Sequence, residues 1–487
     1  MRVLFVYIGV ESMGVEYLAA TARKAGHEVS LAFDPAIFGG HLMWDIPSIA
    51  KKFDKRPQIL KKILEDKPDV VAFSCVTANY IWSLELAREI KKHAPEIQTV
   101  FGGIHVTAVP HRVIEEQAVD NLIVTEADLS FPALLTDMEE GRVERRPGVW
   151  RKAGGELVCE DGWMAVDDLD ALPFPAKDLF YNKAPVLEES YTIMASRGCP
   201  YMCSYCHNSL EVRRATGANK IRRRSVINVI EELEPVAARG RVKIVKFFDD
   251  VFSMDRDWLA GFTAKYISRI KLPYFCFSHP NYLSDEVVDL LAEGGCKFIS
   301  IGIQSVDEGQ RRNVLNRKYD NEVARRCVRR LKKRGVSVFL DQIVGIPGDT
   351  HEMMCEAVTF YNELKPARLL TYWLTYFPGT EILKKATETG LMSEEEMARI
   401  EDGNIDCLYD NPLKGAIPLM EKFRVLFALI PILPAGWIRF LLKNNRFRFL
   451  PGSYMAVNIA YFINAMLKSD AFFLNNVKYL MSKKNVP

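Results

Sequence analysis

The chain has 487 residues, of which 48% are hydrophobic and 26% are charged, as expected for two or three globular domains. Its 64 Lys and Arg against 62 Asp and Glu give a formal net charge of +2, without the basic excess that nucleic-acid binding needs. The start, MRVLFVYIGV, lacks the basic region and cleavage site of a signal peptide, so we expect a cytoplasmic protein whose ten cysteines are ligands or core residues.

Residues 1–140 alternate strands with helices. Apolar strand runs occur at Arg2–Ile8, EVSLAF, DVVAFSCV, QTVFGGI and NLIVTE, with the helical stretches VEYLAATARKAG and WSLELAREIKKHAP among them. Strands separated by helices form right-handed βαβ units, so this pattern predicts a doubly wound, Rossmann-like parallel sheet. Residues 141–186 are rich in turn residues and predict a linker with a small hairpin.

A second alternation of strands and helices covers residues 187–394. Six runs are candidate strands: Tyr191–Ser196, VKIVKFFDD, PYFCFSH, KFISIGIQ, VSVFLDQIVG and ARLLTYWLTYF. Six βα units predict an open, partial (β/α)6 barrel of the TIM type, whose functional residues gather at the carboxyl ends of the strands.

Residues 395–487 form a helical and strongly apolar C-terminal region. Val425–Ile438 is uncharged, but it contains two prolines and a glycine and is too short to span a bilayer. Aromatic and basic residues stand close together in it: Trp437, Lys443, Arg446, Phe447, Arg448 and Phe449. This mixture indicates either a peripheral membrane contact, with a lipid-like or otherwise apolar substrate, or a helical cap over the barrel.

Three cysteines, Cys199, Cys203 and Cys206, stand within eight residues in SRGCPYMCSYCHN, directly after a predicted strand. Soft thiolates select zinc or iron–sulfur centres, and structural zinc sites pair two such short motifs. No second motif exists, because the other cysteines are scattered singly. The loop therefore favours a cubane cluster with one open iron over a structural zinc or three core cysteines.

This loop, with the aromatic Tyr205 before its last cysteine, resembles that of the radical S-adenosylmethionine (SAM) superfamily. The resemblance implies that the three cysteines hold a [4Fe-4S] cluster and that SAM binds its open iron. An external donor of the flavodoxin or ferredoxin type would reduce the cluster, which cleaves SAM to methionine and a 5′-deoxyadenosyl radical. We expect a small or lipid-like substrate from the apolar C-terminal region, and no nucleic acid because the net charge is only +2.

Later segments resemble the strand ends that surround SAM in this superfamily. These segments are KFFDDVFSMD, SIGIQS and DQIVGIPGDT, and the residues implied are Phe248, Asp249, Asp250, Gln304, Ser305, Ile343, Gly345 and Pro347. A carboxylate of the first segment would meet the SAM ammonium group. Relatives commonly have Glu where this chain has Gln304.

The domain ahead of the barrel resembles the cobalamin-binding domains of cobalamin-dependent radical SAM enzymes, through SMGVEYLAATARKAGHEV, PDVVAFSC and FGGIHVTAVP. Ligands of such sheets bind at the carboxyl ends of the strands, where Gly102 and Gly103 would let the backbone approach the nucleotide tail of cobalamin. The same edge is expected to present Ser74, Thr77, His105 and Glu126. The Asp-x-His-x-x-Gly motif of cobalamin mutases is absent, so no cobalt ligand is assigned.

The resemblance favours methylation of an unactivated carbon through methylcobalamin. Oxidative cyclisation, as in the anaerobic porphyrin cyclases, or rearrangement is an alternative within the same architecture. A non-catalytic cobalamin or redox sensor is an alternative of a different class. A methylthiotransferase is disfavoured, because it needs a second set of three cysteines and only Cys75 lies in the N-terminal domain.

Overall fold

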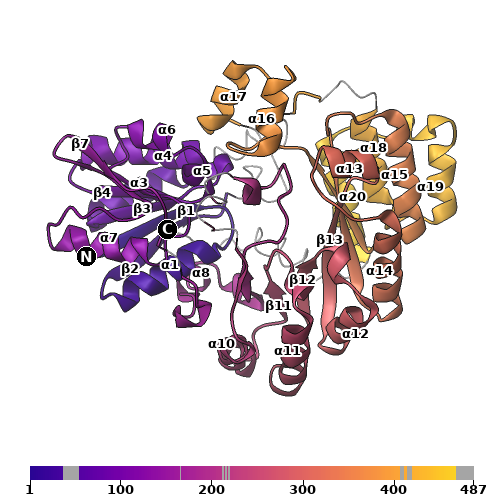
Figure 1. The fold of residues 1–487 in the computed structure, drawn as a ribbon, viewed down its shortest axis with the longest axis horizontal. Helices are drawn as coiled ribbons and strands as arrows, with labels where there is room; N and C mark the ends of the chain where they lie inside the picture. Colours follow the sequence, from indigo (N-terminus) through magenta and orange to yellow (C-terminus); the bar gives the residue numbers. More distant parts are fainter. Residues whose placement is uncertain are drawn as a thin grey trace.

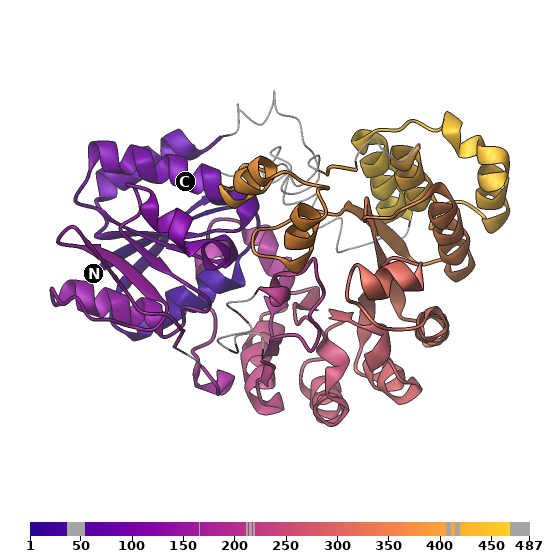
Figure 2. The same cartoon turned by 45° about the horizontal axis from the view of Figure 1, so that its top comes forward.

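The computed structural model describes residues 1–36, 54–164, 166–210, 213, 217, 220–405, 411–413 and 419–467. The predicted fold class is confirmed: two largely parallel sheets flanked by helices are followed by C-terminal helices (Figure 1). A second view shows the two sheets side by side, with the last helices of the chain, drawn in yellow, at the end remote from the first sheet (Figure 2). Within the described residues, no helix is long and apolar enough to cross a membrane.

The first sheet has seven strands in the order β2-β1-β3-β4-β5-β6-β7. Its first five strands are parallel: β1 (Arg2–Ile8), β2 (Glu28–Asp34), β3 (Val70–Ser74), β4 (Gln98–Gly102) and β5 (Asn121–Ile123). The hairpin predicted within residues 141–186 is present as β6 (Val149–Ala153) and β7 (Glu156–Cys159). It extends the first sheet by pairing antiparallel to β5, which the sequence pattern did not indicate.

The strands of the first sheet are buried almost continuously, because helices cover both of its faces. One face packs against α3 (Arg56–Asp66), α4 (Thr77–His93), α5 (Ile104–Ala108) and α6 (Pro110–Glu115). The other face packs against α1 (Met13–Lys24), α7 (Ser130–Glu139) and α8 (Asp178–Tyr181). This is the doubly wound arrangement, in which a ligand site lies at the carboxyl edge of the sheet.

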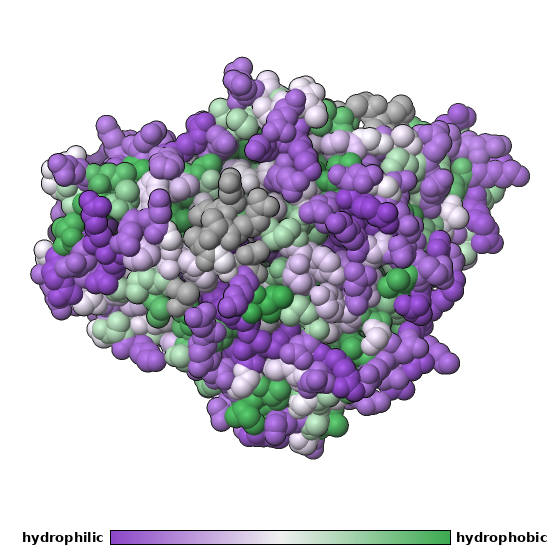
Figure 3. Space-filling model, in the orientation of Figure 1, coloured by the Kyte–Doolittle hydropathy of each residue, from purple (hydrophilic) through white to green (hydrophobic). Residues whose placement is uncertain are grey.

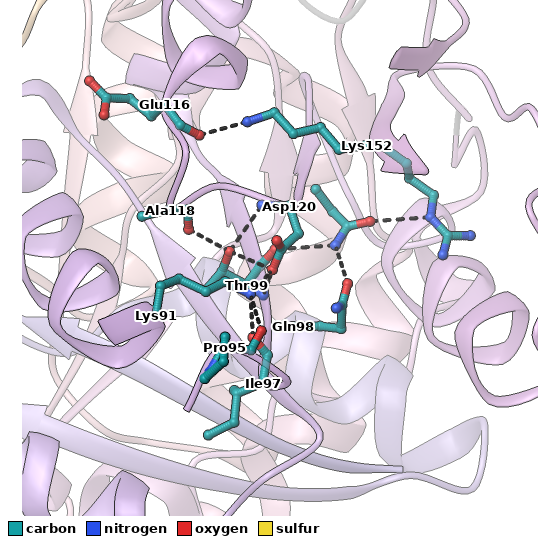
Figure 4. A network of polar contacts seen from close by, with 11 residues as sticks. Lys91, Pro95, Ile97, Gln98, Thr99, Glu116, Ala118, Asp120 and Lys152 are labelled. Carbon is teal, nitrogen blue, oxygen red and sulfur yellow. Dashed lines mark hydrogen bonds and ion pairs between the residues drawn. The ribbon is translucent and has the colours of Figure 1, made fainter. Parts of the chain in front are cut away.

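A partly buried polar network fixes the opposite, amino-terminal edge of this sheet (Figure 4). The carboxylate of Asp120 accepts from the backbone N–H of Thr99 at 2.8 Å and lies 2.6 Å from Lys91 Nζ. Lys91 also donates to the carbonyl of Ile97 at 2.7 Å. These contacts hold the starts of β4 and β5 in register, so the strand ends at the other edge are presented on a rigid support.

The second sheet has six parallel strands in the order β15-β14-β13-β12-β11-β8. Their bounds are β8 (Ser190–Ile193), β11 (Ile244–Phe247), β12 (Tyr274–Ser278), β13 (Cys296–Gln304), β14 (Ser337–Val344) and β15 (Arg368–Trp373). Its outer helices are α10 (Val226–Ala238), α11 (Arg256–Arg269), α12 (Asp285–Glu293), α14 (Asn321–Lys333) and α15 (His351–Leu364), with the short α13 (Glu308–Asn313) after β13. Because β8 and β15 do not pair with each other, the barrel is open, as predicted.

The C-terminal region has two parts. The first, α16 (Glu381–Glu388) and α17 (Glu394–Glu401), reaches back to the first domain, where Arg112 lies 2.9 Å from both Glu401 and Asp402. In the second part, α18 (Met420–Leu429) and α20 (Tyr454–Leu467) cover β15, and α19 (Ala435–Leu442) packs against α15. The apolar run Val425–Ile438 is not one helix, since α18 ends before its first proline and α19 begins after its second.

The edge of β15 is sealed by α20. The hydroxyl of Tyr461 accepts from the backbone N–H of Thr371 at 2.8 Å, and Asn464 Nδ2 donates to the carbonyl of Ala367 at 3.0 Å. These side chains satisfy backbone groups that an unpaired edge strand would leave open. The face seen in Figure 3 is mostly polar, with scattered apolar residues.

Candidate active site

The three cysteines lie on a loop that leaves β9 (Ser196–Arg197) at the mouth of the barrel and enters the short turn η3 (His207–Ser209). Gly198 has φ +93°, a left-handed backbone that admits the sharp turn into Cys199. The N–H of Cys206 donates to the carbonyl of Cys203 at 3.0 Å, which folds the second half of the motif on itself. The loop therefore returns all three side chains to one region of the barrel mouth.

The segment after α13 holds this loop in place. The N–H of Ser204 donates to the carbonyl of Leu315 at 3.1 Å, and Asn316 Nδ2 donates to the carbonyl of Met202 at 2.8 Å. The guanidinium of Arg317 lies 3.7 Å from the sulfur of Cys203 and donates to the carbonyl of Gly302 at 2.8 Å. Arg317 therefore places a positive charge beside one of the three sulfur atoms of the loop.

Burial keeps the thiols of Cys199 and Cys206 neutral without a metal. It raises the pKa of Cys199 to about 12 and also raises the pKa of Cys206. An iron–sulfur cluster must therefore displace their protons, as metal binding to thiols does. Among the described residues, no three His, Cys, Asp or Glu side chains are placed to hold a single metal ion, whereas a cubane takes each thiolate on a separate iron.

A cavity of about 330 Å³ lies between the carboxyl edges of the two sheets. From the first domain it is lined by Ser74, Gly102, Gly103, Thr125, Glu126 and Asp128, among others. From the barrel it is lined by Met194, Ser196, Arg197, Gly198, Phe248 and Asp250. Gly198 directly precedes Cys199, so the cluster loop and the edge predicted for cobalamin face one space.

The two glycines at the end of β4 have different roles. Gly102 lines the cavity, and a Cβ there would meet nothing nearer than the Ile123 carbonyl at 3.7 Å. Gly103 has φ +99°, and a Cβ there would lie 2.5 Å from the Cys75 carbonyl oxygen and 2.7 Å from its nitrogen. Gly103 therefore permits the close approach of the loops after β3 and β4. This structural role is additional to the approach to cobalamin that the sequence predicts for it.

We expect Gly103→Ala to lower the free energy of unfolding by about 1–3 kcal/mol, because the added Cβ must displace backbone and the φ is strained. Gly102→Ala is the matched control and should change stability by less than about 1 kcal/mol, because there is room for its Cβ. Urea unfolding of the two cofactor-free variants makes the comparison. Equal stability of the two variants would contradict the steric role of Gly103.

Thr125 lines the same cavity with an unusual backbone. Its φ of +69° is rare for a β-branched residue, and its N–H is held by the hydroxyl of Thr107 at 2.8 Å. Its own buried hydroxyl oxygen has no hydrogen-bond partner among the described residues. A strained residue with an unpaired polar atom at a cavity wall is a feature that a polar ligand would satisfy.

The three residues after β11 alternate in direction. Phe248 is 42% exposed, lies edge-on to Phe277 at 5.5 Å and lines the cavity together with Asp250. Asp249 instead turns inward, where its carboxylate accepts from the backbone N–H of Ala195 at 3.1 Å and from the hydroxyl of Ser196. Asp250 is thus the carboxylate that faces the cavity, and Asp249 holds the start of the cluster loop.

The predicted residues at the ends of β13 and β14 lie at the carboxyl edge of the barrel but not on the cavity wall. Gln304 has φ +70° next to an irregularity in the pairing of β13 with β14. Ser305 donates its hydroxyl to Gln310 Oε1 at 2.6 Å. Ile343 belongs to a small apolar cluster against which the ring of Tyr205 packs.

The turn after β14 depends on Gly345. Its φ is +74°, and a Cβ there would lie 2.6 Å from the ring of Trp373. Asp349 accepts from the N–H of Gly345 at 2.8 Å, and the carbonyl of Pro347 lies 3.4 Å from Gln310 Nε2. This turn is therefore held from within and presents its backbone at the barrel edge.

Two residues expected at the cobalamin edge lie beneath it. His105 is buried against the ring of Tyr80, and its Nδ1 lies 3.3 Å from the hydroxyl of Thr77. Burial lowers the pKa of His105 to about 3, so its ring is neutral. Neither His105 nor Thr77 lines the cavity, whereas Ser74 at the end of β3 does.

Ion pairs join the two domains around the cavity. Arg197, next to the cluster loop, lies 2.6 Å from Asp128 and 3.1 Å from Glu126. Arg222 on β10 (Arg222–Arg223), which pairs with β9, donates to Glu126 at 3.0 Å. Arg197 and Arg222 were not identified from sequence as site residues, because their partners lie far away along the chain.

A second buried ion group lies beneath the first. Lys177 Nζ is 2.7 Å from both Glu11 and Glu16, and Glu11 also accepts from the hydroxyl of Thr192 on β8 at 3.0 Å. Burial raises the pKa of Glu16, and the charge of Lys177 opposes that shift. Together the two groups fix the first sheet against the barrel.

Family models match both domains. The model of the B12 binding domain matches residues 6–135, and that of the radical SAM superfamily matches residues 193–361. The chain belongs to the radical SAM superfamily and carries a B12-binding domain. Its cofactors are a [4Fe-4S] cluster, SAM and cobalamin, and it is an enzyme of the radical SAM type.

Individual relatives of this radical SAM enzyme are distant. It is 25% identical over 386 residues to the uncharacterized methyltransferase PH0819 of Pyrococcus horikoshii, covering 78% of this chain and 79% of that protein. It is 23% identical over 408 residues to the anaerobic magnesium-protoporphyrin IX monomethyl ester cyclase of Rubrivivax gelatinosus, covering 78% and 68%.

Solved structures resemble the radical SAM enzyme in fold. The cobalamin-dependent SAM radical enzyme OxsB has a TM-score of 0.70 at 13% identity, covering 99% of this chain and 78% of OxsB. The radical SAM methyltransferase TsrM from Kitasatospora setae has a TM-score of 0.64 at 18% identity, covering 80% and 76%.

The residues of the site fit these cofactors. Three thiols on one loop are the donor set of a cluster with an open iron, and Arg317 lies next to one of them. At the facing edge, the unpaired hydroxyl of Thr125 and the open side of Gly102 leave room and a polar partner for cobalamin. The radical SAM enzyme therefore has chemically suitable residues on both walls of one cavity.

Proposed function

We propose that this radical SAM enzyme methylates an unactivated carbon of a small or lipid-like molecule. The observation that carries the proposal is the cavity lined on one side by Gly198, at the start of the cluster loop, and on the other by the cobalamin edge. When bound, the cluster with SAM supplies a hydrogen-abstracting radical, and methylcobalamin supplies the methyl group. A substrate carbon must reach both, so the two sources have to share one water-poor space.

In this proposal each residue group has a separate task. Cys199, Cys203 and Cys206 hold the cluster, with Tyr205 packed behind the loop. Asp250 and Phe248 bind SAM from the cavity wall, and the turn residues of the barrel edge shape the rest of its site: Gln304, Ser305, Ile343, Gly345 and Pro347. On the cobalamin side, Ser74, Gly102, Gly103 and Thr125 form the contact edge, supported from below by Thr77 and His105.

Glu126 and Asp249 have altered tasks in this proposal. Glu126 is engaged by Arg197 and Arg222, so it joins the domains instead of binding cobalamin through a free carboxylate. Asp249 holds Ser196 at the start of the cluster loop. Both residues position the cofactor-binding segments.

The reductant and the cellular setting complete the proposal. An external donor of the flavodoxin or ferredoxin type would supply electrons to the cluster. The enzyme would act in the cytoplasm, with a peripheral membrane contact through its C-terminal helices. The exposed aromatic and basic residues of that region support such a contact.

Oxidative cyclisation is the second candidate, favoured by the similarity to the magnesium-protoporphyrin cyclase of Rubrivivax gelatinosus. The two reactions differ in their products. In methylation the substrate hydrogen would pass to the 5′-deoxyadenosyl radical, which becomes 5′-deoxyadenosine. The methyl group of a second SAM would end on the product, leaving S-adenosylhomocysteine. Cyclisation consumes no methyl group.

The products of SAM therefore test the proposed function. We expect anaerobic turnover of the reconstituted protein to form S-adenosylhomocysteine together with 5′-deoxyadenosine, measured by mass spectrometry. Formation of 5′-deoxyadenosine without S-adenosylhomocysteine during turnover would indicate cyclisation or rearrangement and contradict methylation. The absence of any SAM cleavage by the reduced protein would favour a redox sensor.

A further inference from the structure

α19 lies at the end of the molecule farthest from the first sheet (Figures 1 and 2), and large aromatic side chains of this region are exposed to solvent. Trp437 and Phe440 on α19 are 61% and 50% exposed, and Phe449 at the end of η6 (Lys443–Phe449) is 78% exposed. We call these aromatics and the neighbouring cations the α19 surface; it comprises Trp437, Arg439, Phe440, Lys443, Arg446, Arg448 and Phe449.

The α19 surface is exclusively basic. From residue 422 to residue 467 the sequence has no Asp or Glu and six Lys or Arg, in a chain whose net charge is only +2. Within the described part of the chain, no ion pair joins Arg439, Lys443, Arg446 or Arg448 to an acidic residue. The cations instead lie against aromatic rings: Arg446 is 4.2 Å from the ring centre of Phe440, and Arg448 is 4.8 Å from that of Phe449.

Folding of the C-terminal region does not require these exposed aromatics. The segment is anchored from its other face by Ile438 and Phe447, both fully buried in the core of the barrel domain. The ring of Phe447 lies tilted against that of Phe423 at 4.4 Å and stacked with that of His351 at 6.2 Å. The two faces of α19 and η6 therefore have separate functions, one for the core and one for contact outside the chain.

An anionic lipid surface is the partner that fits this chemistry. Aromatic rings favour the level of the lipid headgroups, and each Lys or Arg next to an anionic leaflet adds binding free energy. The short α19 suits a helix lying in the plane of the interface and not one crossing it. A protein partner or a second copy of this chain would need acidic groups opposite this surface, and the chain's own α19 surface has none.

We propose that the α19 surface docks the enzyme on anionic lipid membranes, with Trp437, Phe440 and Phe449 among the headgroups and the four cations on the lipid charges. Docking through the α19 surface specifies which residues and which lipid class make the peripheral contact included in the proposed function. It does not depend on methyl transfer. Docking would place the barrel next to a source of apolar substrates.

Vesicle sedimentation of the full chain tests this. We expect binding to vesicles of equal parts phosphatidylcholine and phosphatidylglycerol, little binding to phosphatidylcholine alone, and weaker binding as salt is raised. Each of Lys443→Gln and Arg448→Gln should weaken binding about fivefold. Trp437→Ala should weaken it at least about tenfold, through loss of ring burial.

The matched control is the double variant Lys61→Gln and Lys92→Gln, which removes two exposed charges from the first domain. It should bind as the native chain does, and all variants should keep the native unfolding midpoint and cleave SAM in solution at the native rate.

Absence of binding, equal binding to both vesicle types, or unchanged binding of the Trp437 and Arg448 variants would overturn the proposal. A self-associated state that Trp437→Ala dissociates would assign the surface to a second copy instead. Because SAM cleavage is measured without vesicles, its failure would count against the proposed function and not against docking.

Discussion

Replacing Cys203 with alanine is expected to leave the protein without iron and unable to cleave SAM. Cys203 is the buried member of the motif, with its sulfur 3.7 Å from Arg317, and two remaining thiols cannot hold a cube by three corners. Iron and sulfide content after anaerobic reconstitution, the visible absorption of the cluster and formation of 5′-deoxyadenosine measure the loss.

The matched control for this prediction is Cys355→Ala. Cys355 is a partly buried cysteine on α15, away from the cluster loop, and its loss should leave iron content and SAM cleavage at native levels. Circular dichroism should show both variants folded. Full iron loading of Cys203→Ala, or binding of zinc and no iron by the native protein, would disprove the cluster assignment.

The second large effect is expected at the ion pairs between the domains. Arg197→Met removes the ion-pair partner of Asp128, which is only 4% exposed, and one of the two ion-pair partners of Glu126. Removing one member of a buried pair leaves an uncompensated charge, so we expect a loss of about 3–5 kcal/mol in the free energy of unfolding. Urea unfolding of the cofactor-free protein measures it.

Function should respond in a way that a purely structural role would not produce. Asp128→Asn lies in the first domain and leaves the cluster loop unchanged, so SAM cleavage should persist while methylated product falls relative to 5′-deoxyadenosine. Arg241→Met, which breaks an exposed pair with Glu188, is the control and should change stability by less than about 1 kcal/mol. If Arg197→Met were as stable as this control, the interdomain pairs would not hold the domains together.

The elements that sequence predicted well are those specified by local pattern. The run Arg2–Ile8 is β1 with the same bounds, and all six barrel strands occur where apolar runs indicated them. The cysteine spacing likewise located the loop at the barrel mouth, since three thiols in eight residues are a local signal. Successive side chains of an extended segment point in opposite directions, which explains why Asp249 turns inward while Phe248 and Asp250 face the cavity. The residue types of the motif alone do not indicate these directions.

Features that depend on distant partners were not predictable in this way. Arg197 meets Asp128 across 69 residues of sequence, and Arg317 reaches Cys203 across 114. The left-handed backbone of Thr125 is imposed by neighbours such as Thr107, not by its own side chain, which disfavours it. Domain boundaries remain predictions for the same reason, because the hairpin in the supposed linker belongs to the first sheet.

The seal on β15 has a consequence for how the protein folds. Until α20 arrives, the backbone groups at Thr371 and Ala367 face solvent as a template for strand addition by another chain. Since α20 is synthesised after the barrel strands, the nascent enzyme passes through a stage at which it is prone to aggregate. Truncation before α18 would make that stage permanent, so the C-terminal helices belong to any fragment meant to stay monomeric.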